Sequence, residues 1–333
     1  MKVLLTCPPM INRISNYQDI LKNNNIEIEI PKFTQVMKEE ELIKIIGKYD
    51  GWIIGDDPAT KAVFEAGSKG NLKYAVKWGV GIDNVDFDAC RKLNIPITNI
   101  PNVFGEEVSD IAIGMLLNLS RKINLIDLET KNGGWIKPCG ESLYGKKVCL
   151  IGFGDIGRHT ARKLLAFNLD IWVSDPACKK TNGKIKYNYG HGFNNYTPEL
   201  TKLLNSINDV NIDTLDNCLR DANYIIVTCA LNEKTKYLVN RENILKCKKG
   251  VKIINVARGP IVNENDVIEL LDEKFIDSVG FDVFETEPLP IDSGLRRFNQ
   301  NIYGSHNGSN TQEAVDKTSK IAINNILKFY KMI

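Results

Sequence analysis

The chain has 333 residues, of which 43% are hydrophobic and 25% are charged. That composition is ordinary for a globular protein, and the length is sufficient for two domains. The 43 basic and 41 acidic residues leave a net charge of +2, which argues against nucleic acid or a membrane surface as a partner bound by charge alone.

The apolar runs are short. None approaches the roughly 18 residues that a membrane-spanning helix needs, and Met1–Pro9 is too short for a signal peptide and is expected to form a first strand. The eight cysteines include no CxxC pair, so we expect neither a disulfide framework nor a metal site. The expectation is a cytoplasmic protein with reduced thiols.

Residues 1–100 alternate short apolar runs with helical patterns, such as Glu39–Ile46 and Asp86–Leu93. This alternation predicts a parallel sheet with helices on both faces. After the fourth strand, the glycine-rich stretch KWGVGIDN exposes backbone N–H groups around Val80 and Gly81 that can hold a carboxylate; a plain strand-to-helix turn is the alternative. The expected strands are Val3–Thr6, Ile26–Ile30, Trp52–Ile54, Leu72–Lys77 and Ile97–Asn99.

The stretch Asn99–Asn102, with its proline, is interpreted as a hinge. A long amphipathic helix is expected over Glu106–Ile123, because its apolar residues are spaced for one face. A polar, glycine-rich loop, Lys131–Gly145, leads from it to the next strand.

Residues 147–176 read KVCLIGFGDIGRHTARKLLAFNLDIWVSDP, which is a strand, a glycine turn, a helix, a second strand and an acid. Gly152 permits a tight turn, Gly154 lets a pyrophosphate approach the backbone, and Gly157 lets the helix pack close to the sheet. The phosphates would then lie at the helix N-terminus, where the N–H groups of Asp155 and Ile156 and the helix dipole favour negative charge.

Asp175 lies 175 − 157 = 18 residues beyond the last glycine, near the usual spacing of about 20. Its carboxylate can accept hydrogen bonds from ribose hydroxyls and repels a 2′-phosphate, which favours NAD over NADP. Lys179 and Lys180 leave NADP open, because either could meet a 2′-phosphate; a solvated basic loop is the alternative. A structural glycine turn in another α/β protein is the alternative to the whole dinucleotide interpretation.

The segment at about 178–211 interrupts the alternation and is rich in Asn, Lys, Gly and Tyr. We expect a long loop with a short helix over Thr197–Leu204. It is interpreted either as a surface insertion without fixed structure or as a segment that flanks the cofactor or a subunit contact.

Strands and helices then alternate again to the end of the chain. Strands are expected at Tyr224–Val227, Val251–Val256, Ser278–Val283 and Asn301–Tyr303. Helices are expected at Asp213–Arg220 with Asp213 as its cap, at Ile244–Lys248 with Asn240 as its cap, at Asn263–Glu273, and from about Asn310 to the end.

An enzyme that oxidises an alcohol with a nicotinamide needs a group to take the hydroxyl proton, and histidine suits that task. The chain has three histidines. His159 lies inside the helix after the glycine turn and is interpreted as a surface or packing residue, while His191 lies in the insertion. His306 follows a strand-like segment and is the best candidate, with a structural histidine as the alternative.

Arg258 ends the strand in INVARG, where a planar guanidinium can bind a carboxylate through two bonds. Glu285 and Glu287 in DVFETEP are rival candidates to orient the histidine and stabilise its protonated form. A solvated arginine and a charged surface turn are the plain alternatives.

Seven stretches occur in the order known from one enzyme family, and they cover nearly the whole chain except 178–211. On these stretches the sequence resembles the D-2-hydroxyacid dehydrogenases, the group that contains D-3-phosphoglycerate dehydrogenase, glyoxylate and hydroxypyruvate reductases, D-lactate dehydrogenase and formate dehydrogenase. The resemblance is closest to the phosphoglycerate dehydrogenase branch, without the regulatory ACT domain of some members. The stretches are KWGVGIDNVD, IPITNIPNVFGEEVSD, GFGDIG with Asp175, LNEKT, INVARGPIVNENDV, GFDVFETEPLP and GSHNGSNTQEA.

The resemblance implies roles for individual residues. Arg258 would bind the substrate carboxylate, His306 would exchange the proton, and Glu287 would be the partner of the histidine. The backbone of Val80 and Gly81 would also contact the substrate carboxylate. The residues that would lie along NAD, besides the glycine turn and Asp175, are Thr228, Ala230, Thr235, Val256, Asp282 and Gly308, with Asp282 holding the nicotinamide amide.

The family fold is α/β, with two doubly wound parallel-sheet domains. A Rossmann NAD-binding domain, residues 101–303, would be inserted into a flavodoxin-like catalytic domain, residues 1–100 and 304–333, with the active site between them and a homodimer formed through the cofactor domain. The chain departs from the family in carrying Gly304-Ser305 where Thr-Pro is frequent, Asn102 where glycine is frequent, and Thr228 where histidine is common.

The expected activity is NAD-dependent hydride transfer at C2 of a D-2-hydroxy acid or 2-keto acid, with a phosphorylated substrate or a glyoxylate or hydroxypyruvate type of substrate as branches. The partner is then a small carboxylate, not nucleic acid or membrane. An NAD-sensing, corepressor-like regulator is the alternative from another class. Formate oxidation is disfavoured, because formate has no hydroxyl proton for a glutamate-paired histidine to remove.

Overall fold

The chain crosses between two units at two points in the computed structural model, which describes residues 1–33, 36–181, 184–187, 202–203, 206–207 and 209–331. The first unit is Met1–Phe104 with Asn310–Ile333, and the second unit is Gly105–Ser309. No helix in these described ranges is long and apolar enough to cross a membrane.

Both crossings lie a few residues later than the sequence predicts, after 104 and 309 instead of 100 and 303. Phe104 packs on Trp78 of the first unit, with ring centroids 5.6 Å apart. The backbone N–H of Gly308 donates to the carboxylate of Asp282 in the second unit, at 2.8 Å. These contacts place His306 in the second unit.

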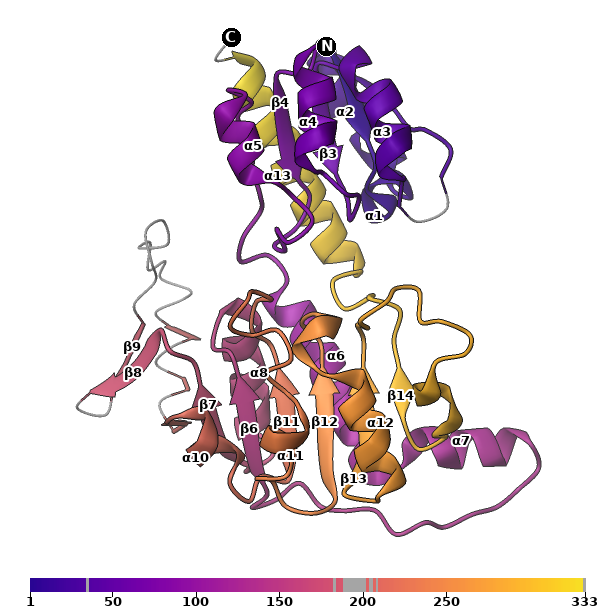
Figure 1. The fold of residues 1–333 in the computed structure, drawn as a ribbon, viewed down its shortest axis with the longest axis vertical. Coiled ribbons are helices and arrows are strands. Elements are labelled where there is room, and N and C mark those ends of the chain that lie inside the picture. Colours follow the sequence, from indigo (N-terminus) through magenta and orange to yellow (C-terminus); the bar gives the residue numbers. More distant parts are fainter. Residues whose placement is uncertain (34–35, 182–183, 188–201, 204–205, 208, 332–333) are drawn as a thin grey trace. The chain divides into compact units, whose positions relative to one another are not determined.

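A five-stranded parallel sheet in the order β2-β1-β3-β4-β5 forms the first unit (Figure 1). All residues of β3 and β4 are buried, as expected for parallel strands covered on both faces. The strands are β1 (Lys2–Leu5), β2 (Glu27–Glu29), β3 (Gly51–Ile54), β4 (Tyr74–Lys77) and β5 (Ile97–Thr98). The helices are α1 (Pro8–Ile11), α2 (Gln18–Asn23), α3 (Glu39–Ile45), α4 (Lys61–Ser68), α5 (Phe87–Lys92) and α13 (Gln312–Lys331), with short 3₁₀ turns at Ile14–Tyr17 and Ile46–Lys48.

The last helix returns to the first unit although it is some 200 residues away in sequence from the rest of that unit. It packs against β4 and α1. Asp316 of this helix accepts two bonds from the Arg13 guanidinium, at 3.0 and 3.1 Å, and one from the Tyr17 hydroxyl at 2.7 Å. The ion pair therefore ties both ends of the chain into one unit.

A seven-stranded parallel sheet in the order β10-β7-β6-β11-β12-β13-β14 forms the second unit. The chain runs from β6 outward to β7 and β10, and then from β11 outward to β14 on the other side. This is the doubly wound Rossmann arrangement, whose order reverses between β6 and β11. The strands are β6 (Lys147–Ile151), β7 (Asp170–Ser174), β10 (Asn211–Ile212), β11 (Tyr224–Val227), β12 (Val251–Asn255), β13 (Ile276–Phe281) and β14 (Ile302–Tyr303).

Helices flank this sheet, and α6 packs against α8, β12 and β13. The cluster of buried apolar side chains around β11, β12 and β13 forms the core. The helices are α6 (Gly105–Arg121), α7 (Ile123–Lys131), α8 (Asp155–Leu165), α10 (Leu215–Leu219), α11 (Arg241–Ile244) and α12 (Glu264–Asp272), with 3₁₀ turns at Gly259–Ile261 and Gly294–Arg297.

The helix predicted over Glu106–Ile123 is α6, which spans Gly105–Arg121, and a further helix that the sequence does not predict, α7, follows it. Lys122 adopts the left-handed conformation, with φ +56°, so the hydrogen-bond ladder of α6 ends before it and α7 begins after it. One cap differs from the prediction, because Thr214 caps α10 instead of Asp213. Asn240 is a cap as predicted, but its helix begins at once, at Arg241, three residues earlier than predicted.

Part of the insertion has regular structure where the sequence predicts a loop. β8 (Cys178–Thr181) and β9 (Lys184–Tyr187) pair antiparallel as a hairpin. Their sequences, CKKT and KIKY, contain too few apolar residues for a strand period to be recognised. Most of the predicted helix Thr197–Leu204 and His191 lie outside the described residues.

Candidate active site

The predicted site residues of the second unit follow the carboxyl ends of its strands, on both sides of the point where the strand order reverses. Ligands of doubly wound sheets bind in this position, because the diverging connections leave a crevice there. The glycine turn follows β6, and Thr228 follows β11. Arg258, Asp282 and His306 follow β12, β13 and β14 in turn.

The three glycines of the turn have the properties that the sequence predicts. Gly152 has φ +93°, and a Cβ there would lie 2.6 Å from the backbone of Cys229. A Cβ on Gly157 would lie 2.3 Å from the carbonyl oxygen of Gly152. A Cβ on Gly154 would meet nothing within 4 Å. The first and last glycines are thus required by packing, whereas the middle one borders open space that a phosphate can enter.

α8 begins directly after the open glycine, at Asp155. The N–H groups of Asp155 and Ile156 belong to its first turn, which has no intrahelical acceptors and favours an anion. Arg158, one turn further on, is 2% exposed and donates to the carbonyl of Phe153 at 3.1 Å. This buried arginine braces the turn. The sequence offers one signal for this role, which is an arginine on the buried face of the helical pattern.

The carboxylate of Asp175 is oriented by the backbone. The N–H of Phe153 donates to its Oδ2 at 2.7 Å, and the N–H of Ala177 donates to its Oδ1 at 2.8 Å. Carboxylate oxygens can each accept more than one hydrogen bond, and ribose hydroxyls are suitable donors. The first of these bonds also ties the end of β7 to the glycine turn, so the acid and the turn hold each other in place.

A cavity of about 550 Å³ lies beside this carboxylate, within the ~300–1,000 Å³ range of small-molecule sites. The open space at Gly154 and the acceptor at Asp175 fit the pyrophosphate and ribose of a dinucleotide. Lys179, at the start of the β8–β9 hairpin, also borders the cavity. Its lining residues are Ser174, Asp175, Pro176, Cys178, Lys179, Ile212, Asp213, Thr214 and Leu215.

The segment after β11 borders the same crevice. The hydroxyl of Thr228 donates to the carbonyls of Ile151 and Gly152 at 3.1 and 2.9 Å, so its proton is used to hold the glycine turn. The hydroxyl of Thr235 donates to the carbonyl of Ala230 at 2.7 Å and closes a tight loop. Val256, at the end of β12, is buried.

His306 and Glu287 are in contact. The imidazole Nδ1 lies 2.8 Å from Oε2 of Glu287, and both side chains are about one-third exposed, at 34% and 35%. The other oxygen of Glu287 accepts the N–H of Phe284 at 3.0 Å. With Nδ1 on the carboxylate, Nε2 is the nitrogen that can act on a substrate oxygen.

The rival acid, Glu285, has a different environment. Its carboxylate accepts the N–H of Glu264 and the hydroxyl of Tyr237, each at 2.8 Å. It therefore fixes the start of α12, and only Glu287 of the two acids contacts the histidine.

Asp282 holds the loop that carries His306. Its two carboxylate oxygens accept the N–H groups of Asn307 and Gly308, at 3.1 and 2.8 Å. Burial raises the pKa of the Asp282 carboxyl, although these two backbone bonds work in the opposite direction. Gly304 must be small here, because a Cβ would lie 2.0 Å from Oδ1 of Asp282. This contact explains in packing terms why this chain has glycine at that position.

Arg258 caps the 3₁₀ turn after β12, and its Nη1 donates to the carbonyl of Ala257 at 2.9 Å. The next residue, Gly259, packs on the backbone of Phe284 so closely that a Cβ would lie 1.8 Å away. The turn with the arginine therefore lies against the turn that leads to Glu287.

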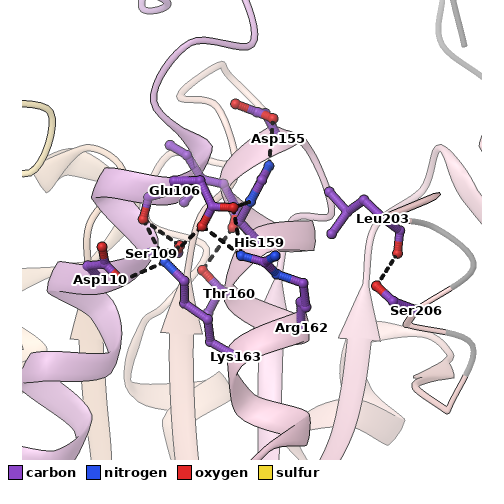
Figure 2. Close-up of polar contacts among 11 residues, drawn as sticks. Glu106, Ser109, Asp110, Asp155, His159, Thr160, Arg162, Lys163, Leu203 and Ser206 are labelled. Carbon is purple, nitrogen blue, oxygen red and sulfur yellow. Dashed lines mark hydrogen bonds and ion pairs between the residues drawn. The ribbon is translucent and has the colours of Figure 1, made fainter. Parts of the chain in front are cut away.

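Three residues named in the sequence analysis remain: Val80, Gly81 and His159. Val80 and Gly81 belong to the first unit, after β4. His159 lies on α8 between two carboxylates (Figure 2), 3.1 Å from Glu106 and 3.6 Å from Asp155, which is a more polar position than the surface or packing role that the sequence suggests.

The model of the family described as "D-isomer specific 2-hydroxyacid dehydrogenase, NAD binding domain" matches residues 113–204 and 192–308. The hydroxypyruvate reductase of Thermotoga maritima is 31% identical over 314 residues, which cover 92% of each chain. The D-3-phosphoglycerate dehydrogenase of Bacillus subtilis is 32% identical over 263 residues, which cover 78% of this chain and 46% of that relative. The apo-structure of D-lactate dehydrogenase from Escherichia coli has 25% identity and a TM-score of 0.79, covering 99% of this chain and 97% of that one. The fold, the dinucleotide turn and these similarities agree, and the chain belongs to the D-isomer-specific 2-hydroxyacid dehydrogenase family, as an NAD-dependent oxidoreductase.

Proposed function

We propose that the protein interconverts a small, unphosphorylated 2-keto acid and its D-2-hydroxy acid, with hydroxypyruvate and glyoxylate as the first candidates. The contact of 2.8 Å between His306 and Glu287 carries the proposal, because it is the arrangement that proton exchange at a substrate oxygen needs. The choice of substrate is supported by the hydroxypyruvate reductase relative, which this chain matches over 92% of its length. The match to the D-3-phosphoglycerate dehydrogenase relative covers only 46% of that relative's length, so a phosphorylated substrate is the second candidate.

In the direction of reduction, protonated His306 donates its Nε2 proton to the carbonyl oxygen as that oxygen gains negative charge. Glu287 stabilises the imidazolium and keeps the proton-bearing nitrogen turned toward the substrate. In the direction of oxidation the neutral imidazole takes the hydroxyl proton. NADH, when bound, supplies the hydride that reaches C2.

We assign binding and orientation of the substrate to one charged side chain and to backbone N–H groups. The guanidinium of Arg258 would bind the substrate carboxylate and fix the carbonyl carbon in one orientation. The backbone N–H groups of Val80 and Gly81 are proposed as further donors to that carboxylate. Asp175 and the first turn of α8 would hold the adenosine ribose and the pyrophosphate, and Asp282 and Gly308 would border the nicotinamide end.

The proposal is tested by NADH oxidation with a panel of 2-keto acids: hydroxypyruvate, glyoxylate, pyruvate and 3-phosphohydroxypyruvate, each repeated with NADPH. The highest kcat/KM is expected for hydroxypyruvate or glyoxylate with NADH. A preference for the phosphorylated acid would replace the first candidate with the second. Tight NADH binding without turnover of any member would contradict the proposed reaction.

We also propose that the protein is a homodimer formed through the second unit. α7 has no buried residue, and the segment that follows exposes Trp135 by 80% and Tyr144 by 75%. Figure 1 shows α7 and this segment extending beyond the sheet of the second unit. Large exposed aromatic side chains gathered in one segment are typical of a surface that a second copy of the chain covers.

Light scattering after gel filtration should give twice the mass of one chain. The double variant Trp135→Ser with Tyr144→Ser should shift the measured mass toward that of one chain.

A further inference from the structure

His159 has no part in the proposed reaction, yet it occupies a polar site beside the glycine turn. It lies on the second turn of α8, and its side chain is only 19% exposed. Nε2 is 3.6 Å from Oδ1 of Asp155, one turn earlier on the same helix, and Nδ1 is 3.1 Å from Oε1 of Glu106 at the start of α6. Figure 2 shows the imidazole between these two carboxylates.

The two carboxylates differ in their other partners. Glu106 also contacts Arg162, at 2.6 Å, and Lys163, at 3.2 Å. Burial by itself raises the pKa of Glu106, but the positive charges of His159, Lys163 and Arg162 outweigh it and hold that pKa below its ordinary value. For Asp155, no cation other than His159 is in contact among the described residues.

Asp155 is the first residue of α8 and directly follows Gly154, where the backbone borders open space. A carboxylate at this helix end is favourable for the helix itself. It is unfavourable for a pyrophosphate that binds to the same first turn, because like charges repel. A positive charge on His159 cancels that repulsion.

Gly105 keeps the pair in place. A Cβ on this residue would lie 2.4 Å from Cδ2 of His159 and 2.7 Å from Oδ2 of Asp155. The start of α6 therefore packs closely on the imidazole and the carboxylate, with no room for a side chain between them.

We propose that His159 is a positioning residue of the cofactor site: its protonated imidazole neutralises Asp155 and ties the first turn of α8 to Glu106 of α6, so the protein binds the dinucleotide pyrophosphate most tightly when His159 carries its proton. The inference rests on the NAD site and is independent of which keto acid is the substrate.

The charges around the imidazole set the sign of the pH effect. Asp155 faces it from its own helix and Glu106 faces it from α6, while Arg162 and Lys163 contact Glu106, and Lys163 also contacts Asp110 at 2.6 Å. When the imidazole loses its proton at higher pH, Asp155 regains its full effect on the pyrophosphate and the dissociation constant increases. By linkage, binding of the pyrophosphate takes up part of a proton.

The probe for the test is ADP-ribose, which carries the pyrophosphate but lacks the nicotinamide, so His306 does not contribute. Its dissociation constant is measured by titration calorimetry at pH 6 and pH 8.5, in two buffers of different ionisation enthalpy. The wild type should bind roughly three- to tenfold more weakly at pH 8.5, the effect of one screened charge a few ångströms away. Adenosine, without phosphates, should show no such change.

Three variants separate this role from a merely structural one. His159→Gln should bind ADP-ribose at both pH values as weakly as the wild type does at pH 8.5, with no proton uptake. The double variant His159→Gln with Asp155→Asn should recover the affinity that the wild type has at pH 6, because the repelling charge is gone. Arg162→Gln, which removes a neighbouring partner of Glu106, should keep the pH dependence. An unchanged pH dependence in His159→Gln, or no recovery in the double variant, would overturn the proposal.

Discussion

Replacing Glu287 with glutamine removes the negative charge beside His306 but keeps a group that can accept a hydrogen bond. We expect kcat for keto-acid reduction at pH 7.5 to fall by roughly ten- to a hundredfold, with NADH affinity unchanged. The reason is that the carboxylate stabilises the protonated imidazole, which is the form that donates the proton.

The magnitude follows from the contact. Opposite unit charges about 4 Å apart attract by about 4 kcal/mol at an effective dielectric constant of about 20. Both side chains are about one-third exposed, so water screens part of this attraction, and the amide keeps part of the bond. A net loss of about 1.5–3 kcal/mol remains, and every 1.36 kcal/mol or so is a factor of about ten in rate.

Stopped-flow and steady-state NADH oxidation, followed from pH 5.5 to 9, measure the effect. Because the imidazolium loses its stabilising partner, the pH at which reduction slows should move to lower values in Glu287→Gln. Glu285→Gln is the matched control, since Glu285 lies two residues away and contacts Glu264 and Tyr237 instead. A kcat for Glu287→Gln within twofold of the wild type, or an equal loss in the control, would refute the assignment.

Three further predictions address the substrate, the cofactor and the fold. Arg258→Ala should raise the keto-acid KM about ten- to a hundredfold, the loss of a charged hydrogen-bonding partner, without changing NADH affinity; an unchanged KM would remove the arginine from carboxylate binding. Asp175→Ser should weaken NADH about tenfold and reduce the preference over NADPH in kinetic assays, and a preserved preference would contradict its role. Hydrogen bonds from Arg13 and then from Tyr17 lower the pKa of Asp316 to about 2, so this carboxylate stabilises the fold above pH 4 and loses that effect as pH falls toward 2. Asp316→Asn should lower the free energy of unfolding at pH 7 by about 1 kcal/mol, with a gap to the wild type that narrows below pH 4 in urea titrations; a gap independent of pH would show that the ion pair is not its cause.

The dinucleotide turn could be predicted from the sequence because all its parts are local. The strand, the three glycines, the helix and Asp175 lie within 30 residues, so their spacing can be read directly from the sequence. The structure adds the reasons: the glycines at 152 and 157 have no room for a Cβ, whereas Gly154 borders open space.

Other features could not be predicted from the sequence, because the local residue pattern favours no single structure there. The apolar period continues from α6 toward α7, and only the left-handed backbone at Lys122 separates the two helices. The β8–β9 hairpin is held by backbone pairing of residues without a strand-like apolar pattern. The chain crosses between the two units a few residues beyond the predicted boundaries, where Phe104 and Gly308 contact residues more than 20 positions away in sequence.

The sequence by itself determined the fold class and the dinucleotide turn and supplied the candidates for the catalytic residues, because strand and helix periods and glycine spacing are encoded in consecutive residues. The family resemblance points to Glu287 as the partner of the histidine, and the tertiary structure supplies the physical reason: Glu287 contacts His306, whereas Glu285 accepts bonds from Glu264 and Tyr237. Only the tertiary structure placed His159 between Asp155 and Glu106, because the second of these comes from another helix, 53 positions earlier in the chain (159 − 106 = 53), and a contact across that separation exists only when α6 and α8 pack together.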